Sequence, residues 1–324
     1  MFKNMMNRYY YGKSGQGDYE KEDLPRTRMQ LFWEMLRTRL SGLVRLNLVY
    51  SVIWIPAMIV IVKAISSLLN LGAAMEDPSL LNMETAITPE MFSDFFHSTI
   101  FYTLLWLIPC IGITGPATAG LCYVTRNWAR DEHAFAWSDY KDAIKANWKP
   151  ALLNSFITGC VPLLVYICYT FYGDRAASSF FFLIPQSLVV LLGIIWMMMQ
   201  MYIYPQIVTY TLGYGGVLRN SLILTIGRLP QSVLFRVITL VVPALIFVVA
   251  LLLPGQYTYL MLLVLGAYYI LIGFALSRFV AASYSNAVFD RYINVNLEGV
   301  EVDRGLYKEE DDALDDDENE SIDA

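Results

Sequence analysis

The chain has 324 residues, of which 56% are hydrophobic, and a formal net charge of −6 at pH 7. Soluble globular domains are usually about 45–50% apolar, so the composition argues against a soluble protein, and no nucleic-acid partner is expected. The apolar residues form six runs of about 20 residues each, the length with which a helix crosses about 30 Å of hydrocarbon. The runs are Leu46–Leu69, Thr99–Tyr123, Ala151–Phe171, Phe181–Tyr204, Val233–Leu253 and Tyr257–Phe279.

The six runs predict membrane-spanning helices, because a backbone exposed to lipid must satisfy its own hydrogen bonds. The runs are apolar on all faces and lack the alternation of barrel strands. The predicted fold is therefore an all-α, polytopic bundle of six transmembrane helices, with residues 46–295 as the membrane domain. The lipid bilayer is its first expected partner.

Residues 1–45 are predicted to form a basic cytoplasmic segment. Residues 1–25 are polar and are expected to be irregular. Residues 26–45 have the pattern of a basic amphipathic helix that lies in the membrane interface and leads into the first spanning helix. Its apolar residues recur at helical spacing and are surrounded by arginines: Leu31, Phe32, Met35, Leu36, Leu40 and Leu43, with Arg28, Arg37, Arg39 and Arg45.

Lys and Arg are distributed asymmetrically along the chain. Of the 23 such residues, 21 lie in segments 1–45, 126–149, 219–236 and 278–324. These segments share one side if every run crosses the membrane, and that side is expected to be cytoplasmic. The sequence therefore predicts a bacterial cytoplasmic membrane protein with both termini in the cytoplasm.

The sequence GITGPATAG, residues 112–120, stands out within the second run. Gly115 and Ala119 form a small-x-x-x-small pair that allows close helix approach, and Thr118 lies between them. Pro116 is predicted to break the helical ladder near the cytoplasmic end. One interpretation is a kinked helix that lines a polar cavity, and the favoured alternative is a tight packing joint.

The loop TRNWARDEHAFAWSDYKDAIKANWK, residues 125–149, combines aromatic residues with both charge signs. A metal or acid–base site could use His133 with nearby carboxylates, but one histidine with scattered acids is weak evidence for such chemistry. The preferred interpretation is an interfacial helix anchored by aromatic side chains and lysines. The aromatic residues are Trp128, Trp137 and Trp148.

Three passages of the sequence resemble one another. RTRLSGLVRLNLVYSVIWIP, DAIKANWKPALLNSFITGCVP and NSLILTIGRLPQSVLFRVITLVVP each read as an amphipathic helix followed by a spanning helix with an internal proline. We therefore predict three pseudo-repeated units, each made of an interfacial helix and a helical hairpin. Membrane proteins built from repeats often place their sites at repeat interfaces.

The sequence offers little chemistry for catalysis. No Asp or Glu lies inside any run, which disfavours a proton-coupled carrier. The four cysteines lie in or beside apolar runs, without C-x-x-C or metal-ligand spacing, so neither a metal nor a cofactor is expected and the protein is predicted not to be an enzyme. Residues 296–324 become polar and then acidic, with ten acidic residues within Glu309–Asp323, and are expected to be disordered.

Several long strings resemble the YesL-like family of uncharacterised bacterial membrane proteins. GPATAG, followed by YVTRNWARDEHAFAWSDYKDAIKANWKPAL, is similar to the family's signature, and RLNLVYSVIWIP is similar to its first helix. YPQIVTYTLGYGGVLRNSLILTIGRLP resembles its later cytoplasmic loop. The resemblance implies a location in the bacterial cytoplasmic membrane but no reaction. It implies an association with carbohydrate uptake and glycan degradation, because family members often neighbour such genes.

Two functional hypotheses follow, ahead of a membrane enzyme, for which no cluster of His, Asp, Glu or Cys with usable spacing is visible. The first is a non-enzymatic accessory component that binds a membrane partner, such as a sugar-uptake permease or a sensor. The alternative is a small-solute facilitator for sugar-like molecules, which requires polar residues to converge on one cavity: Asn47, Thr114, Thr118, Asn154, Thr158, Gln200, Gln206 and Thr209. The candidate functional residues combine the broken helix with the polar–aromatic loop: Gly115, Pro116, Thr118, Arg126, Asn127, His133 and Trp137.

Overall fold

The computed structural model describes residues 24–76, 87–253 and 257–307, and this part of the chain is helical, without strands. Short 3₁₀ turns occupy Phe180–Phe182 and Asn294–Asn296, and a π-helical turn, Tyr269–Gly273, joins α9 to α10. The α-helices are α2 (Arg28–Glu76), α3 (Pro89–Gly112), α4 (Thr114–Trp128), α5 (Ser138–Ala176), α6 (Leu183–Thr209), α7 (Tyr214–Gly227), α8 (Leu229–Leu252), α9 (Thr258–Tyr268) and α10 (Phe274–Tyr292).

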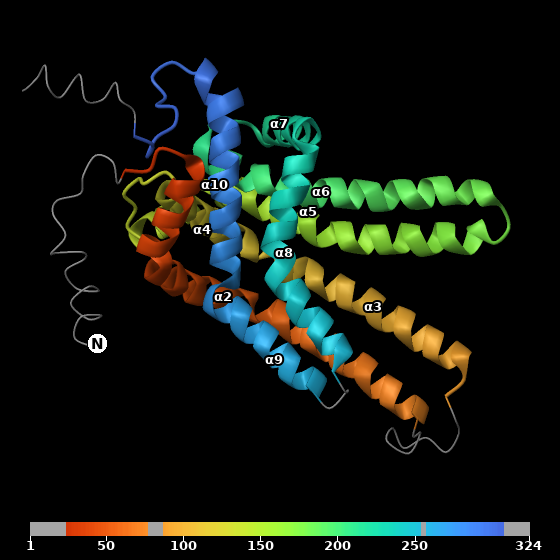
Figure 1. The fold of residues 1–324 in the computed structure, drawn as a ribbon. Coiled ribbons are helices and arrows are strands. Elements are labelled where there is room, and N and C mark those ends of the chain that lie inside the picture. Colours follow the sequence, from red (N-terminus) through yellow and green to blue (C-terminus); the bar gives the residue numbers. More distant parts are fainter. Residues whose placement is uncertain (1–23, 77–86, 254–256, 308–324) are drawn as a thin grey trace, which may run out of the picture.

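Six helical segments within these ranges are long and apolar enough to cross a membrane, which confirms the predicted polytopic all-α fold. Helix α2 packs against α3, α5 against α6, and α8 against α9. The tips of these hairpins point to the right and the bottom of Figure 1, whereas α4, α7 and the end of α10 lie at the opposite end. The sequence repeat proposed for the three hairpins stays a prediction.

The second apolar run does not form one spanning helix as predicted. The apolar segment of spanning length is α3, which starts ten residues before the run and ends at Gly112. After Ile113 the chain continues as the separate helix α4. The break has a local cause: Pro116 has no N–H to donate to the carbonyl of Gly112, four residues earlier. The Thr114 hydroxyl donates to the neighbouring carbonyl of Ile111 at 2.8 Å.

The predicted interfacial helices differ in how they join the spanning helices. The basic segment 26–45 and the first spanning helix form one continuous helix, α2, with 49 residues. Likewise, α5 runs without interruption from the loop residues into the third run. Only α7 is a separate short helix, which ends at Gly227 directly before α8. Their location in a membrane interface stays a prediction.

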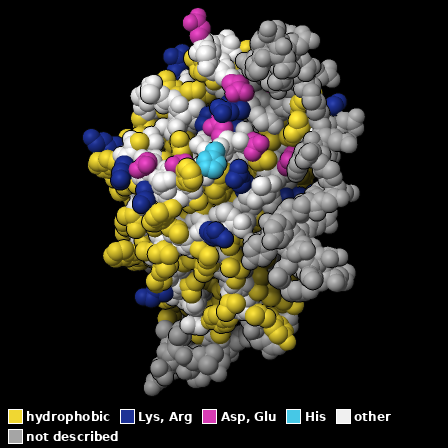
Figure 2. Space-filling model, turned by 90° about the vertical axis from the view of Figure 1, so that its left-hand side faces the viewer, with side chains coloured by type: hydrophobic (Ala, Val, Ile, Leu, Met, Phe, Trp, Pro, Cys, Tyr) yellow, Lys and Arg dark blue, Asp and Glu magenta, His cyan; other side chains and the backbone are white. Residues whose placement is uncertain are grey.

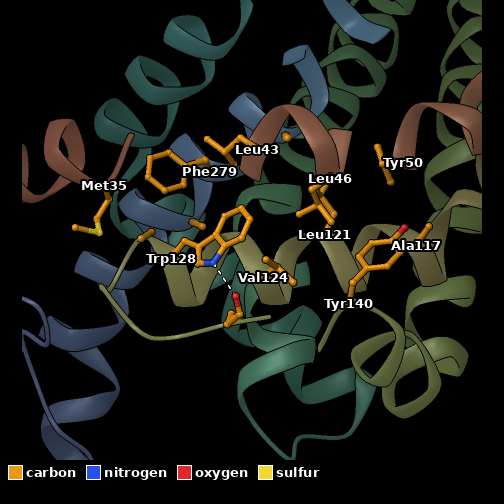
Figure 3. Packing of buried hydrophobic residues seen from close by; sticks show 14 of the residues in the cluster. Met35, Leu43, Leu46, Tyr50, Ala117, Leu121, Val124, Trp128, Tyr140 and Phe279 are labelled. Atoms are coloured by element: carbon orange, nitrogen blue, oxygen red, sulfur yellow. Dashed lines mark hydrogen bonds between the residues drawn. The ribbon is translucent and has the colours of Figure 1, made fainter. Parts of the chain in front are cut away.

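The main hydrophobic core lies where α2, α4 and α10 meet, at the end away from the hairpin tips. In Figure 3, the side chains of α2 lie along one side of α4, and Phe279 of α10 lies next to Leu43. Full burial of one such large side chain stabilises the fold by about 1.5–3 kcal/mol. The α2 and α4 side chains labelled in this view are Met35, Leu43, Leu46, Tyr50, Ala117, Leu121, Val124 and Trp128.

A buried asparagine on α2 binds the π-helical turn. The Asn47 amide donates to the carbonyls of Tyr269 and Ile270 at 2.8 and 2.7 Å, and its oxygen accepts from the N–H of Ala275 at 2.8 Å. A π turn leaves backbone groups without their ordinary i to i−4 partners. Asn47 supplies these partners and thereby attaches α10 to α2.

The C-terminal segment folds onto the core further than the sequence predicts. Residues 297–307, which fall in the expected disordered tail, contact α2 and the loop after α4: the Tyr307 N–H donates to the Pro25 carbonyl at 3.0 Å, and Leu306 packs against the core. Gly305 has φ +82°, and a Cβ there would lie 2.8 Å from the Arg130 carbonyl oxygen. The acidic residues from 308 onward lie outside the described residues.

Candidate functional site

Helix α4 is buried on nearly all sides and positions the candidate residues. Twelve of its 15 residues are buried. Small residues make this possible: a Cβ added at Gly115 would lie 2.3 Å from the Ala151 carbonyl oxygen, and one at Gly120 would lie 2.7 Å from the Tyr140 ring. The backbones of α4 and α5 are therefore in direct contact, which matches the interpretation of GITGPATAG as a packing joint.

Pro116 and Thr118 lie in the first turns of α4. Pro116 is the third residue of the helix, where no intrahelical N–H bond is required. It therefore starts a new helix, and it does not kink an existing one. The buried Thr118 hydroxyl lies 2.7 Å from the Tyr50 hydroxyl and donates to the Thr114 carbonyl at 2.8 Å, so it joins α4 to α2.

Arg126 and Asn127 form the last turn of α4. The carbonyl of Asn127 accepts the N–H groups of Arg130 and Glu132 at 3.0 and 2.9 Å and so shapes the turn that follows. Asp131, within this turn, has φ +56°. Burial lowers the pKa of Arg126, and repulsion by Arg130 adds to this effect, although Glu132 opposes it.

Hydrogen bonds fix the loop between α4 and α5, and two of its aromatic side chains are exposed. The buried Trp128 indole donates to the Ala134 carbonyl at 3.2 Å, the dashed bond of Figure 3, and the Asp139 carboxylate accepts the Phe135 N–H at 2.9 Å. Phe135 and Trp137 nevertheless remain 65% and 57% exposed. The loop is thus an ordered surface that presents two large aromatic side chains.

The seven candidate residues lie in three separate places along α4 and the loop that follows it. Gly115, Pro116 and Thr118 lie in the core, Arg126 and Asn127 at the end of α4, and His133 and Trp137 on the exposed loop. The His133 ring packs edge-on against Phe135 at 4.6 Å, and Trp137 stacks on Tyr140 with Lys141 over its ring. Figure 2 shows a histidine among charges of both signs on this face of the molecule.

An ion-pair cluster that the sequence analysis did not identify joins distant parts of the chain. Asp290, which is 2% exposed, accepts from Arg28 at the start of α2 and lies 3.5 Å from Arg130 after α4. Arg28 also pairs with Asp303, and the Arg130 guanidinium donates to the Glu301 carbonyl at 3.0 Å. No local motif could have revealed this cluster, because its members lie up to 275 residues apart.

The polar residues that a solute path requires do not converge. Asn47 binds the π turn, Asn154 donates to Gln200 at 2.9 Å, and Gln206 donates to Ser221 at 2.9 Å. A cavity of about 630 Å³ opens between the start of α2, α8 and α10, and none of the eight residues lines it. Thr209 lines a separate cavity of about 260 Å³. The facilitator hypothesis therefore lacks the arrangement on which it depends.

The cysteines and acids provide little reactive chemistry. Cys122 is fully buried in α4, and burial raises the pKa of its thiol to about 12, although Arg278 and Arg126 oppose the shift. All four cysteines are free thiols. Within the ranges that the structure describes, no group of three or more His, Cys, Asp or Glu side chains is placed to hold a metal ion.

Comparison with known proteins shows that the segment with the candidate residues is similar to a protein family. The model of a family described as "Protein of unknown function, DUF624" matches residues 99–169, which include most of α3, all of α4 and most of α5. All seven candidate residues lie inside this segment. Comparisons with curated proteins and with solved structures each gave no match. The family similarity and the six apolar helices fit a multi-pass integral membrane protein.

Proposed function

We propose that the protein is a non-enzymatic, partner-binding component of the bacterial cytoplasmic membrane, of the YesL-like type, with both termini in the cytoplasm. The orientation rests on the Lys and Arg residues, which gather at the chain segments opposite the hairpin tips. The proposed partner is a sugar-uptake permease or a membrane sensor. The carbohydrate link rests on the resemblance to the YesL-like family.

The observation that carries the proposal is the ordered loop with exposed Phe135 and Trp137. Exposed apolar side chains on a fixed backbone lose little conformational freedom on binding, and aromatic anchors supply much of the energy of protein interfaces. Because the buried hydrogen bond of Trp128 and the exposed one of Asp139 fix this loop, its aromatic residues are organised before a partner arrives.

A protein partner fits this loop better than the membrane surface does. Trp137 precedes the third apolar run, which starts at Ala151, by 14 residues, or about 21 Å of helix. The loop also carries Asp131 and α5 carries Asp142, with side chains that are 50% and 72% exposed. Each carboxylate lies near a basic side chain, Arg39 at 3.9 Å from Asp131 and Lys145 at 3.7 Å from Asp142, so this face is mixed in charge and lacks the uniformly basic character that binds an anionic leaflet.

Affinity purification in mild detergent tests the proposal. Wild-type protein is expected to recover one membrane protein of sugar uptake or sensing, and F135S/W137S to recover at least about ten-fold less, as expected for hot-spot residues. W106S is the matched control, because Trp106 is 64% exposed but lies on the apolar helix α3. Equal recovery by wild type and F135S/W137S would refute the proposed surface, as would recovery of the protein alone under several detergents.

A further inference from the structure

The cavity of about 630 Å³ between the start of α2, α8 and α10 has the size of a ligand pocket. Helices α2 and α8 each pack against α10, which forms the floor of the cavity between them. Figure 1 shows α10 between the other two helices. The lining on α10 extends from Leu276 to Ala287, or about 16 Å of helix, and continues past the π turn to Tyr268. The cavity is therefore elongated along α10.

The lining of this cavity offers few polar groups to a ligand. Among the described residues that line it, only Arg28 is charged. The Tyr284 hydroxyl accepts from the Tyr202 hydroxyl at 3.0 Å, and the Thr239 hydroxyl donates to the Arg236 carbonyl at 2.7 Å. Because these two hydroxyls already bond to protein groups, a polar solute would lose its hydrogen bonds to water without replacement. The lining therefore suits a hydrocarbon ligand.

The two ends of the cavity differ in polarity. At one end, the Arg28 guanidinium donates to the Asp290 carboxylate within the ion-pair cluster. At the other end, Val242 lies ten residues before Leu252, where α8 ends at a hairpin tip, which corresponds to about 15 Å of helix. Because the hydrocarbon core is about 30 Å thick, Val242 lies near its middle. The cavity therefore extends from the ion-pair cluster to the middle of the bilayer, which is the depth of one leaflet.

The cavity is accessible from the bilayer. Its lining includes large apolar side chains that are exposed at the surface, Met29 and Trp33 on α2 and Ile238 and Val242 on α8. Helix α8 belongs to one of the six segments of membrane-spanning length and composition, so the medium around its exposed apolar side chains is hydrocarbon. Apolar cavities exclude water and accept apolar ligands. A lipid chain can therefore enter this cavity sideways and fill it.

We propose that this cavity binds one acyl chain of a phospholipid from the cytoplasmic leaflet. The chain ends near Val242 and Tyr268, and the glycerol end of the lipid lies beside Arg28. Because Arg28 already pairs with the carboxylates of Asp290 and Asp303, it has no unneutralised charge for a phosphate. The site therefore recognises the chain and accepts anionic and zwitterionic headgroups alike. The bound chain fills the space between α2 and α8 and contacts both helices as well as α10.

Native mass spectrometry of the full chain in mild detergent tests the site, with phosphatidylglycerol and phosphatidylcholine of identical chains as probes. Wild-type protein is expected to bind one molecule of either lipid with affinities within about three-fold of each other, and A287F, which places a ring in the cavity, to bind at least about ten-fold more weakly. A244F is the matched control, because Ala244 is exposed on α8 outside the lining. Binding by folded A287F as tight as by A244F would overturn the proposal, and a larger preference for either headgroup would overturn recognition through the chain.

Photolabelling of the wild-type chain tests the same site without a variant, so it remains decisive even if A287F does not fold. The probe is a phosphatidylcholine with a photoreactive group at the end of one acyl chain, in vesicles that contain the protein. It is expected to label Tyr268, which is half-buried in the cavity lining, at least as strongly as Leu263, which is 68% exposed on the same helix. Weaker labelling of Tyr268 than of Leu263 would mean that lipid chains only surround the protein, and would overturn the proposal.

Discussion

Replacement of Asn47 by leucine tests the packing of α10 against α2. The side chain of Asn47 is fully buried and bonds to three backbone groups, the carbonyls of Tyr269 and Ile270 and the N–H of Ala275. Leucine has the same branched arrangement of heavy atoms but bonds to none of them. Each orphaned group costs about 1 kcal/mol, which lies within the range for both soluble and membrane proteins. We therefore expect N47L to lower the free energy of unfolding by about 3 kcal/mol.

The assay is reversible unfolding in mixed detergent micelles, followed by circular dichroism. N70L is the matched control, because Asn70 lies on the same helix with an exposed side chain, and its free energy of unfolding is expected to stay within about 0.5 kcal/mol of wild type. If N47L matched N70L, the three bonds would not stabilise the π turn, and the explanation of how α10 is attached to α2 would be wrong.

Three other changes test the remaining contacts. G115A is expected to destabilise the protein by about 1–3 kcal/mol, because the new methyl group meets the Ala151 carbonyl at 2.3 Å. G72A is the control, because nothing lies within 4 Å of a Cβ there, and it should unfold no earlier than wild type. Equal effects of the two changes would contradict the α4–α5 contact. D290N is expected to lower the free energy of unfolding by about 3 kcal/mol or more, because it leaves Arg28 and Arg130 without their shared acid. D142N, at an exposed ion pair, is the control. A loss of stability no larger than that of D142N would refute the role of Asp290. In a variant with Cys122 as its only cysteine, the buried thiol, with its pKa near 12, should resist maleimide at pH 8 until the protein unfolds, and rapid labelling of the folded protein would contradict its burial.

The sequence predicts the number and kind of spanning helices because hydrophobic length is a local property. It predicts a break of the helical ladder at Pro116, but not that the spanning helix ends three residues earlier, at Ile113, and that a separate helix follows. The apolar run continues across this point, because the residues of α4 are apolar for burial in protein and those of α3 are apolar for exposure to lipid. Hydropathy cannot distinguish these two surroundings.

The candidate residues show the same limit. Gly115 was expected at a packing joint from small-residue spacing alone, and its contact with Ala151 matches that expectation. The role of Asp290 as a shared acid depends on which helices meet, which no spacing rule reveals. Asn47 binds a turn more than 220 residues away, so its role emerges only from the tertiary fold.

Photo-crosslinking in intact membranes tests the central proposal, partner binding through the loop of Phe135 and Trp137, most directly. A photoreactive residue at position 137 is predicted to capture one protein reproducibly, and one at Phe181, which is 76% exposed next to a hairpin tip, is predicted not to capture it. Mass spectrometry should identify that protein as a membrane component of sugar uptake or sensing. Crosslinks at position 137 only to lipid, or only to a second copy of the chain, would contradict the proposed function.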